Sequence, residues 1–135
     1  MLKKTITYVD YDGNERTEEL YFHMSKAELM ELEMSTPGGF AEMCQRAVAK
    51  QDAPMLMKVF KDLIVKSYGE KSADGKRFAK KDAFGNSLAE EFLQTEAYST
   101  LFMELFSSTD AATEFFTGVI PADLAEAAKK QLPAK

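Results

Sequence analysis

The start of the chain alternates between apolar and polar residues. The alternation is visible around Ile6 and again between residues 17 and 22. A period of two is typical of half-buried strands. Asp12-Gly13 lies between the two segments and favours a reversal of the chain. We therefore expect residues 3–22 to form one antiparallel β-hairpin.

After residue 24 the apolar spacing changes to that of helices. Ser25 and Glu28 have the spacing of a capping box, which predicts a helix that runs to about Met34. A Pro-Gly-Gly segment ends that helix, and a second is expected from Phe40. Asp52 is a suitable cap for a third helix. The buried stripe predicted for this third helix comprises Leu56, Val59, Phe60, Leu63, Ile64 and Tyr68.

The second half of the chain predicts a short hairpin followed by more helices. Residues 69–80 contain a turn signal, Ser-Ala-Asp-Gly, among basic residues, and we expect a second, smaller hairpin or an ordered loop there. Helices are predicted to begin at Ser87, at Thr95 and at Ser108 or Thr109, and a last alanine-rich helix is predicted from Pro121 to about Gln131. The stripe predicted for the Thr95 helix comprises Tyr98, Leu101, Phe102, Leu105 and Phe106.

These elements predict an α+β fold that is mostly α. An N-terminal β-hairpin at residues 1–23 is followed by a helical part at residues 25–131, with about six helices packed as a small bundle. The chain has 135 residues, of which 45% are hydrophobic, so it is long enough to bury one core. We therefore expect residues 1–135 to form a single domain.

Composition and charge narrow the classes of partner. The chain has a net charge of −5 and a pI near 5.0, so it has no overall attraction for nucleic acids or anionic membranes. It has one cysteine, and its N-terminus lacks the apolar segment of a secretory signal. We expect a protein partner, no membrane partner, and a cytosolic location.

The segment DYDGNERTEELY, residues 10–21, begins like a calcium-binding loop. Asp10, Asp12 and Asn14 occupy the first ligand positions of an EF-hand. Glu15 stands where that loop needs glycine, and Tyr21 stands where it needs a bidentate glutamate. Because both flanks also have the pattern of strands, we interpret the segment as a hairpin turn and expect no metal site.

Residues suited to catalysis are few. His23 is the only histidine, which leaves no second histidine for a metal site or a catalytic triad. Cys44 lies on an apolar helical stripe, as expected of a buried structural thiol. No phosphate-binding glycine motif is present. We therefore expect no catalytic residues, no cofactor and no enzymatic activity.

A basic segment is the strongest sign of nucleic-acid binding. It contains Phe78 among six cations, which are Lys66, Lys71, Lys76, Arg77, Lys80 and Lys81. Glu70, Asp74 and Asp82 dilute its charge, and the whole chain is acidic. We therefore interpret the segment as a solvated hairpin and expect no nucleic-acid partner, and the same cations could instead meet an acidic protein surface.

Several helices carry more apolar residues than one buried stripe needs. Met57 and Met103 lie beside the stripes of their helices, and Phe115 and Phe116 are adjacent in a short helix. Methionine suits surfaces that repack against partners. We take these four residues, with Phe78, as candidate contacts for a protein partner. The alternative is that the helices are buried on two sides within a small bundle.

Three long stretches together resemble one protein family. They are ITYVDYDGNERTEELYFHMSKAELMELEMSTPGGFAEM, KSYGEKSADGKRF and EEFLQTEAYSTLFMELF. In texture and order they resemble the tail assembly chaperones of long-tailed bacteriophages, of the type common in phages of Gram-positive bacteria. The resemblance covers most of the chain from about Ile6 to Leu124.

The resemblance implies a small non-enzymatic protein of the host cell cytoplasm that is absent from the mature virion. Such a protein binds and solubilises the tape measure protein during tail morphogenesis and helps to recruit tail tube protein. The surplus apolar residues on the helices add an expectation of self-association. Two alternatives stay open: a structural or minor tail component of the virion, and a small nucleic-acid-binding regulator.

Overall fold

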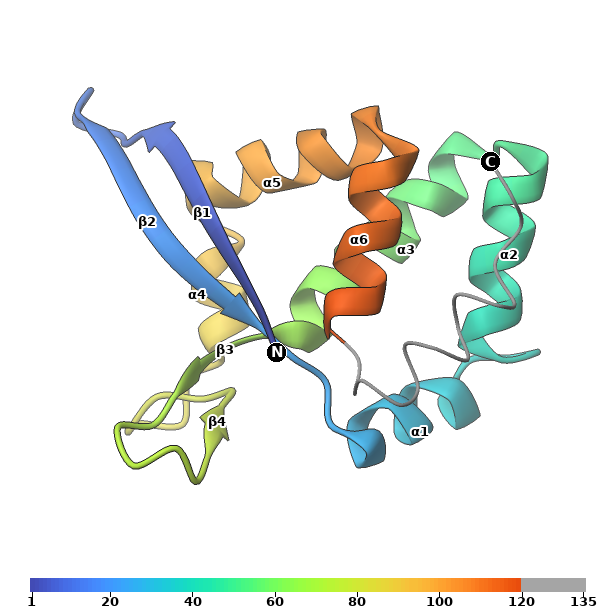
Figure 1. The fold of residues 1–135 in the computed structure, drawn as a ribbon, viewed down its shortest axis with the longest axis horizontal. Helices are drawn as coiled ribbons and strands as arrows, with labels where there is room; N and C mark the ends of the chain where they lie inside the picture. Colours follow the sequence, from blue (N-terminus) through green and yellow to red (C-terminus); the bar gives the residue numbers. More distant parts are fainter. Residues whose placement is uncertain (120–135) are drawn as a thin grey trace.

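The computed structural model describes residues 1–119, apart from the side chain of Val48 (Figure 1). Within them the chain forms an N-terminal hairpin, a further short strand pair and six helices, which confirms the α+β, mostly α prediction. The helix predicted from Pro121 lies outside the described residues. In chain order the elements are β1 (Leu2–Val9), β2 (Glu15–Phe22), α1 (Lys26–Ser35), α2 (Phe40–Lys50), α3 (Ala53–Ser67), β3 (Tyr68–Lys71), β4 (Phe78–Ala79), α4 (Leu88–Phe92), α5 (Glu96–Ser107) and α6 (Thr109–Val119).

Both predicted hairpins are present, and they share one sheet. The strand order is β1-β2-β3-β4, and all neighbouring pairs are antiparallel. β1 and β2 pair along their whole length, whereas β3 pairs with β2 only at Tyr21–Gly69 and Phe22–Tyr68. A Cβ atom on Gly69 would lie 2.5 Å from the carbonyl oxygen of Ala79, so only glycine allows this close approach.

Side-chain caps begin the helices where the sequence predicted them. Ser25 Oγ accepts from the backbone N–H of Glu28, and the Glu28 carboxylate accepts from the N–H of Ser25, which completes the capping box. Asp52, Ser87 and Thr95 each accept a backbone N–H three residues ahead. These predicted starts are therefore confirmed by the hydrogen bonds that produce them.

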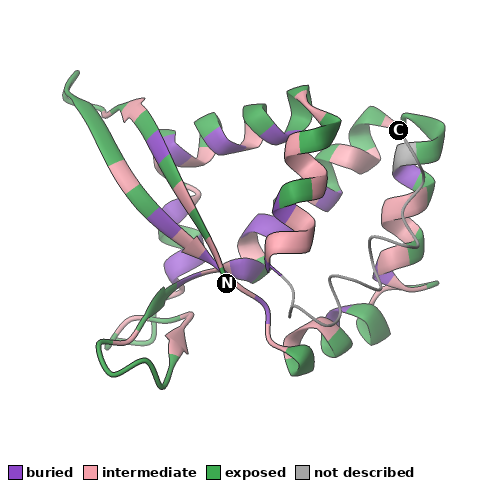
Figure 2. Ribbon diagram, in the orientation of Figure 1, coloured by how far each residue is buried: buried purple, intermediate pink, exposed green. Residues whose placement is uncertain are grey.

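Phe22 lies at the centre of the core. Its side chain is fully buried, and its ring meets the rings of Tyr68, Phe92 and Phe115 edge-on at centroid distances of 5.6, 6.0 and 5.1 Å. Phe22 thereby packs the hairpin against both α4 and α6. Buried residues gather where the hairpin meets the helices, and both hairpin tips are exposed (Figure 2).

The stripe predicted for α5 is partly wrong. Leu101 and Leu105 are buried as expected, and Ala97 extends their row by one turn. Phe106, however, is 38% exposed. The buried face follows the spacing 97, 101 and 105, and the next residue is turned about 100° away from it.

The segment that resembled a calcium loop is a hydrogen-bonded turn. Asp10 Oδ1 accepts from the backbone N–H groups of Asp12 and Asn14, at 2.9 Å each, and Oδ2 accepts from Arg16 Nε. Gly13 has φ +84°, a conformation that favours glycine. The Asp10 carboxylate therefore stabilises the turn by hydrogen bonds within the chain, which agrees with the interpretation of this segment as a hairpin turn.

We expect the hairpin tip to loosen in acid. The hydrogen bonds from Arg16 and Asn14 lower the pKa of Asp10 below its usual 3.8. A lowered carboxyl pKa contributes stability that is present above pH 3.8 and is lost as the pH falls through the folded value. Amide hydrogen exchange at Asp12 and Asn14 should therefore accelerate as the pH falls below about 3.8, after correction for intrinsic exchange. The variant Asp10→Ala should exchange fast at every pH, and an unchanged acid profile in that variant would contradict the assignment.

Candidate protein-binding surface

A chain of aromatic rings leads from the core to the surface. From Phe22 it passes through Phe92 (6.0 Å), Tyr98 (6.0 Å), Phe102 (5.9 Å) and Phe106 (6.2 Å), as centroid distances between successive rings. The first two rings are buried and the last is exposed. The apolar interior of the protein thus opens to solvent at Phe106.

Phe106 forms part of an apolar surface shared by α3 and α5. The Phe60 ring of α3 lies 6.5 Å from Phe102 and 6.4 Å from Phe106. Met57 is one turn before Phe60 and is 47% exposed, and Met103 is one turn before Phe106 and is 54% exposed. We call these five residues the α3–α5 surface. It contains two of the contact residues that the sequence suggested.

The placement of this surface follows from the spacing of the apolar residues along each helix. On α3, Met57, Phe60 and Ile64 fall on one stripe, which is fully buried at Ile64 and open at Met57. On α5, Phe102 is turned about 100° from the buried Leu101 and is half-buried against the core, whereas Met103 is turned about 200° and is exposed. The two helices therefore bury one part of their apolar residues and leave another part at the surface.

Charged residues accompany the apolar ones along both helices. Lys58 and Asp62 form an ion pair at 2.9 Å on α3. Glu104 of α5 pairs with Lys4 of β1 at 2.6 Å and lies about 160° round the helix from Phe102 and Phe106, on the side toward the hairpin. The apolar α3–α5 surface itself fits the apolar stripe of a helical partner.

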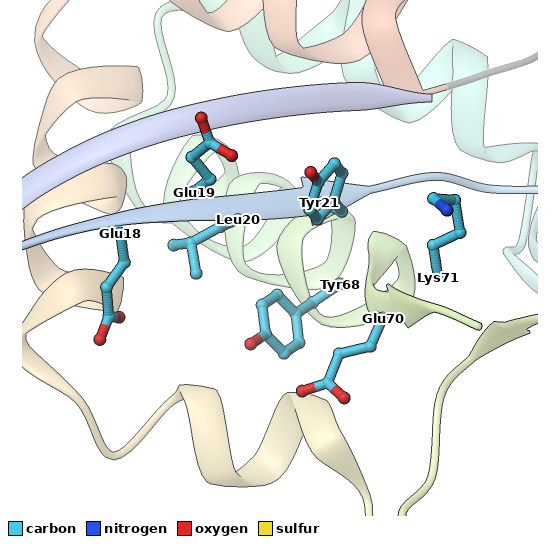
Figure 3. Close-up of a pocket in the computed structure, with 8 residues that line it drawn as sticks. Glu18, Glu19, Leu20, Tyr21, Tyr68, Glu70 and Lys71 are labelled. Atoms are coloured by element: carbon cyan, nitrogen blue, oxygen red, sulfur yellow. The ribbon is translucent and has the colours of Figure 1, made fainter. Parts of the chain in front are cut away.

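A second candidate region is a fork in the sheet, where β3 separates from β2. The fork encloses a hollow of about 550 Å³ lined by Glu18, Glu19, Leu20, Tyr21, Tyr68, Gly69, Glu70 and Lys71. Figure 3 shows the side chains of Glu18, Tyr68 and Glu70 on one side of the strands. Burial raises the pKa of Tyr68, and so do the negative charges of Glu70 and Glu18. The fork is thus an acidic, partly apolar hollow.

The described residues offer no arrangement typical of an active site. Burial raises the pKa of the Cys44 thiol to about 12, so it stays protonated at neutral pH and is a poor nucleophile. Burial lowers the pKa of His23, and its Nδ1 makes no hydrogen bond. Within residues 1–119 no three His, Cys, Asp or Glu side chains gather as metal ligands, and no helix is long and apolar enough to cross a membrane.

Comparison with known families decides what kind of protein this is. The family described as phage tail assembly chaperone matches residues 1–135, which is the whole chain. The chain belongs to this family. Neither the curated proteins nor the solved structures give a significant match. The resemblance found in the sequence is thereby confirmed: this protein is a chaperone of phage tail assembly, and its family indicates protein partners in the tail.

The five residues suggested as partner contacts lie in different parts of the chaperone. Met57 and Met103 are exposed on the α3–α5 surface, whereas Phe115 is 2% exposed and belongs to the core. Its ring is therefore not available to a partner in this fold. Phe116 is half-buried against the core. Phe78 is half-buried on β4, where its ring meets His23 edge-on at 6.0 Å, away from the other four.

Lys80, part of the basic segment, has a structural role in the chaperone. Its Nζ donates to the carbonyl oxygens of His23 (3.1 Å) and Lys66 (2.5 Å) and lies 3.3 Å from the Glu28 carboxylate. Burial lowers its pKa, which the carboxylate of Glu28 opposes. Lys80 thus ties together the end of α3, the segment after β2 and the start of α1, and it is not free to bind a phosphate.

We expect Lys80→Met to destabilise the chaperone by about 1–3 kcal/mol, because the carbonyl groups of His23 and Lys66 would lose a charged donor. Methionine keeps most of the aliphatic length, so the loss isolates the ammonium group. The matched control is Lys81→Met, since Lys81 is the exposed neighbour and should change stability by less than about 0.5 kcal/mol. Urea unfolding followed by circular dichroism gives both values, and equal effects would contradict the role of Lys80.

Sequence reasoning missed the most exposed aromatic residue of the described chain. Phe84 is 89% exposed. Its loop repeats the turn at the hairpin tip: Asp82 Oδ1 accepts from the N–H groups of Phe84 and Asn86, and Gly85 has φ +85°. The shared pattern Asp-x-x-Gly-Asn at residues 10–14 and 82–86 was the signal that could have revealed this second turn.

Proposed function

We propose that this chaperone binds amphipathic helices of the tape measure protein on its α3–α5 surface. It keeps that protein soluble during tail morphogenesis and helps to recruit tail tube subunits to it. The observation that carries the proposal is an apolar surface on a chain of this family, formed by exposed methionines beside Phe106. Covering exposed methionine and phenylalanine side chains with a partner is favourable, because it removes apolar surface from water.

Methionine is well suited to a long and varied helical partner. Its unbranched side chain adopts many shapes, so one surface accommodates successive helical segments of different sequence. Helix binding in a groove uses apolar anchors at spacings of three and four residues. Met57 with Phe60, and Met103 with Phe106, offer two such rows on neighbouring helices.

Co-expression tests the proposed function. The tape measure protein of the same phage should be mostly insoluble alone and soluble with the chaperone, and the two should elute together in size-exclusion chromatography. Adding tail tube protein should give a larger complex only when the chaperone is present. Tape measure protein that stays as insoluble as before, with no complex, would contradict the proposal.

We also propose that the chaperone acts in the host cytoplasm and leaves before the virion is complete. Mass spectrometry of purified virions should then find tail tube and tape measure proteins without stoichiometric amounts of the chaperone. Many copies in the particle would instead support a structural tail component.

A further inference from the structure

The outer edge of β2 is longer than the strand that pairs with it. β2 has eight residues, but its ladder with β3 covers only Tyr21 and Phe22. Beyond Gly69, β3 turns away and pairs with β4 through Glu70–Ala79 and Lys71–Phe78. The rest of β2 pairs with β1 alone and runs along the margin of the molecule (Figure 1). The fork and the free edge of β2 are therefore continuous.

The backbone groups on this edge are ready to pair. The N–H of His23 donates across this edge to the carbonyl of Ser67 at 2.7 Å, which fixes the direction in which this residue faces. Alternate residues of a strand face the same edge, so Thr17 and Glu19 also direct their N–H and C=O groups outward. No residue in the described part of the chain pairs with these groups. An added strand could hydrogen-bond to them in line with β3.

The side chains around the edge select the charge of such a strand. Glu15, Glu18 and Glu19 lie on β2, and Glu70 lies across the fork. Glu18 accepts from the hydroxyl of Tyr8 at 2.9 Å and lies 3.9 Å from Arg16, and Glu19 lies 3.7 Å from Lys3. Lys71 also lines the fork, whereas Glu70 has no ion pair among the described residues. The glutamates outnumber the cations near them, so the edge keeps a small net negative charge.

Charge does not favour pairing of this edge with the same edge of a second copy. An antiparallel pair centred on Thr17 would bring Glu15 opposite Glu19 twice, and like charges in cross-strand positions are destabilising. It would also bring Arg16 opposite Glu18 twice, but these two side chains already pair within one chain at 3.9 Å, so the added attraction is small. Charged edges are also a common protection against such pairing. A strand with lysine or arginine at alternate positions presents its charges on one face, and Glu18 and Glu70 share one face of the fork.

We propose that the free edge of β2 and the fork are a docking site for an extended segment of a partner protein with lysine or arginine at alternate positions. The segment adds to the sheet as a strand beside Thr17 and Glu19, and its cationic side chains enter the fork toward Glu18 and Glu70. This site is separate from the α3–α5 surface, and it does not rest on the function proposed for that surface.

Labelled peptides test the site directly. A fluorescent nine-residue peptide of alternating lysine and threonine should bind the intact chaperone in an anisotropy titration at low salt. The same peptide with glutamate in place of lysine should not bind. A third peptide with every backbone nitrogen methylated keeps the positive charges but cannot donate ladder hydrogen bonds, and it should bind at least about tenfold more weakly. Equal binding of the methylated and unmethylated peptides, or no binding of the lysine peptide, would overturn the proposal.

Two proline variants identify the edge that the peptide uses. Thr17→Pro removes an outward N–H, which edge strands tolerate, and should weaken lysine-peptide binding about tenfold or more. Thr5→Pro is the matched control. Thr5 pairs opposite Glu19 in the β1–β2 register and faces outward on the other edge of the same hairpin. Equal losses in the two variants, at equal melting temperatures, would exclude the β2 edge.

A charge reversal tests the electrostatic part of the proposal without changing the backbone of β2. Glu70→Lys should weaken lysine-peptide binding severalfold, because it places a cation at the fork. Glu114→Lys makes the same change on the exposed side of α6 and should have a smaller effect. Equal effects of the two reversals would show attraction to overall charge alone and would reject the fork as the docking site.

Discussion

Replacing Phe22 with alanine should destabilise the chaperone more than any other single truncation that we predict. Truncation of a fully buried phenylalanine costs about 3–5 kcal/mol, and a domain of this size has about 5–15 kcal/mol in total. Phe22 is fully buried and contacts rings from the β3, α4 and α6 segments. The cavity would therefore open at the point where the hairpin meets the helices. The thermal midpoint should fall by roughly 10–20 °C.

Tyr21→Ala is the control for this substitution. Tyr21 is the adjacent residue of β2 and points to the opposite face of the sheet (Figure 3). Its truncation removes more atoms than Phe22→Ala but little core packing, so it should cost about 1 kcal/mol. Urea unfolding of both variants, with the slope of each transition checked against the parent protein, gives the two free energies. A similar cost for the two would show that Phe22 is not the centre of the core.

The parts of the fold that the sequence predicted depend on local interactions. Ser25, Asp52 and Thr95 begin helices through hydrogen bonds to amides three residues away, so a short window contains the whole cause. The first hairpin likewise follows from alternation and a turn that Asp10 and Gly13 hold. Interactions of this range appear in the sequence as patterns.

The parts that were missed depend on residues far apart in the chain. β4 packs closely on β3 because Gly69 leaves room for the carbonyl group of Ala79, and the fork exists because the pairing of β3 with β2 stops after two residues. Phe106 has the spacing of a core residue, but α5 packs on the core by the row of Leu101 and Leu105 only. Phe115 was suggested as a contact and is instead a neighbour of Phe22. Helical spacing gives the residues that share a face and not the element that covers it.

The second large effect is expected at Met103. In the proposed complex, Met103→Glu places a carboxylate on the α3–α5 surface one turn from Phe106, where burial without a partner charge is costly. We expect affinity for the tape measure protein to fall by about 2 kcal/mol, or roughly thirtyfold. The chaperone itself should stay folded, because Met103 is 54% exposed and the helix propensities of methionine and glutamate are similar.

Met34→Glu is the matched control, because it makes the same change at a methionine of α1 that is 82% exposed. Affinity is measured by titration of labelled tape measure helices into each variant, and the thermal midpoint of each variant is measured alone. If Met103→Glu lowers the midpoint as much as a core substitution, the side chain belongs to the core. If Met34→Glu alone loses affinity, α1 binds the partner. The proposal predicts a loss confined to Met103→Glu at an unchanged midpoint. Among the described residues, exposed methionines border a row of aromatic rings that continues into the core only on α3 and α5.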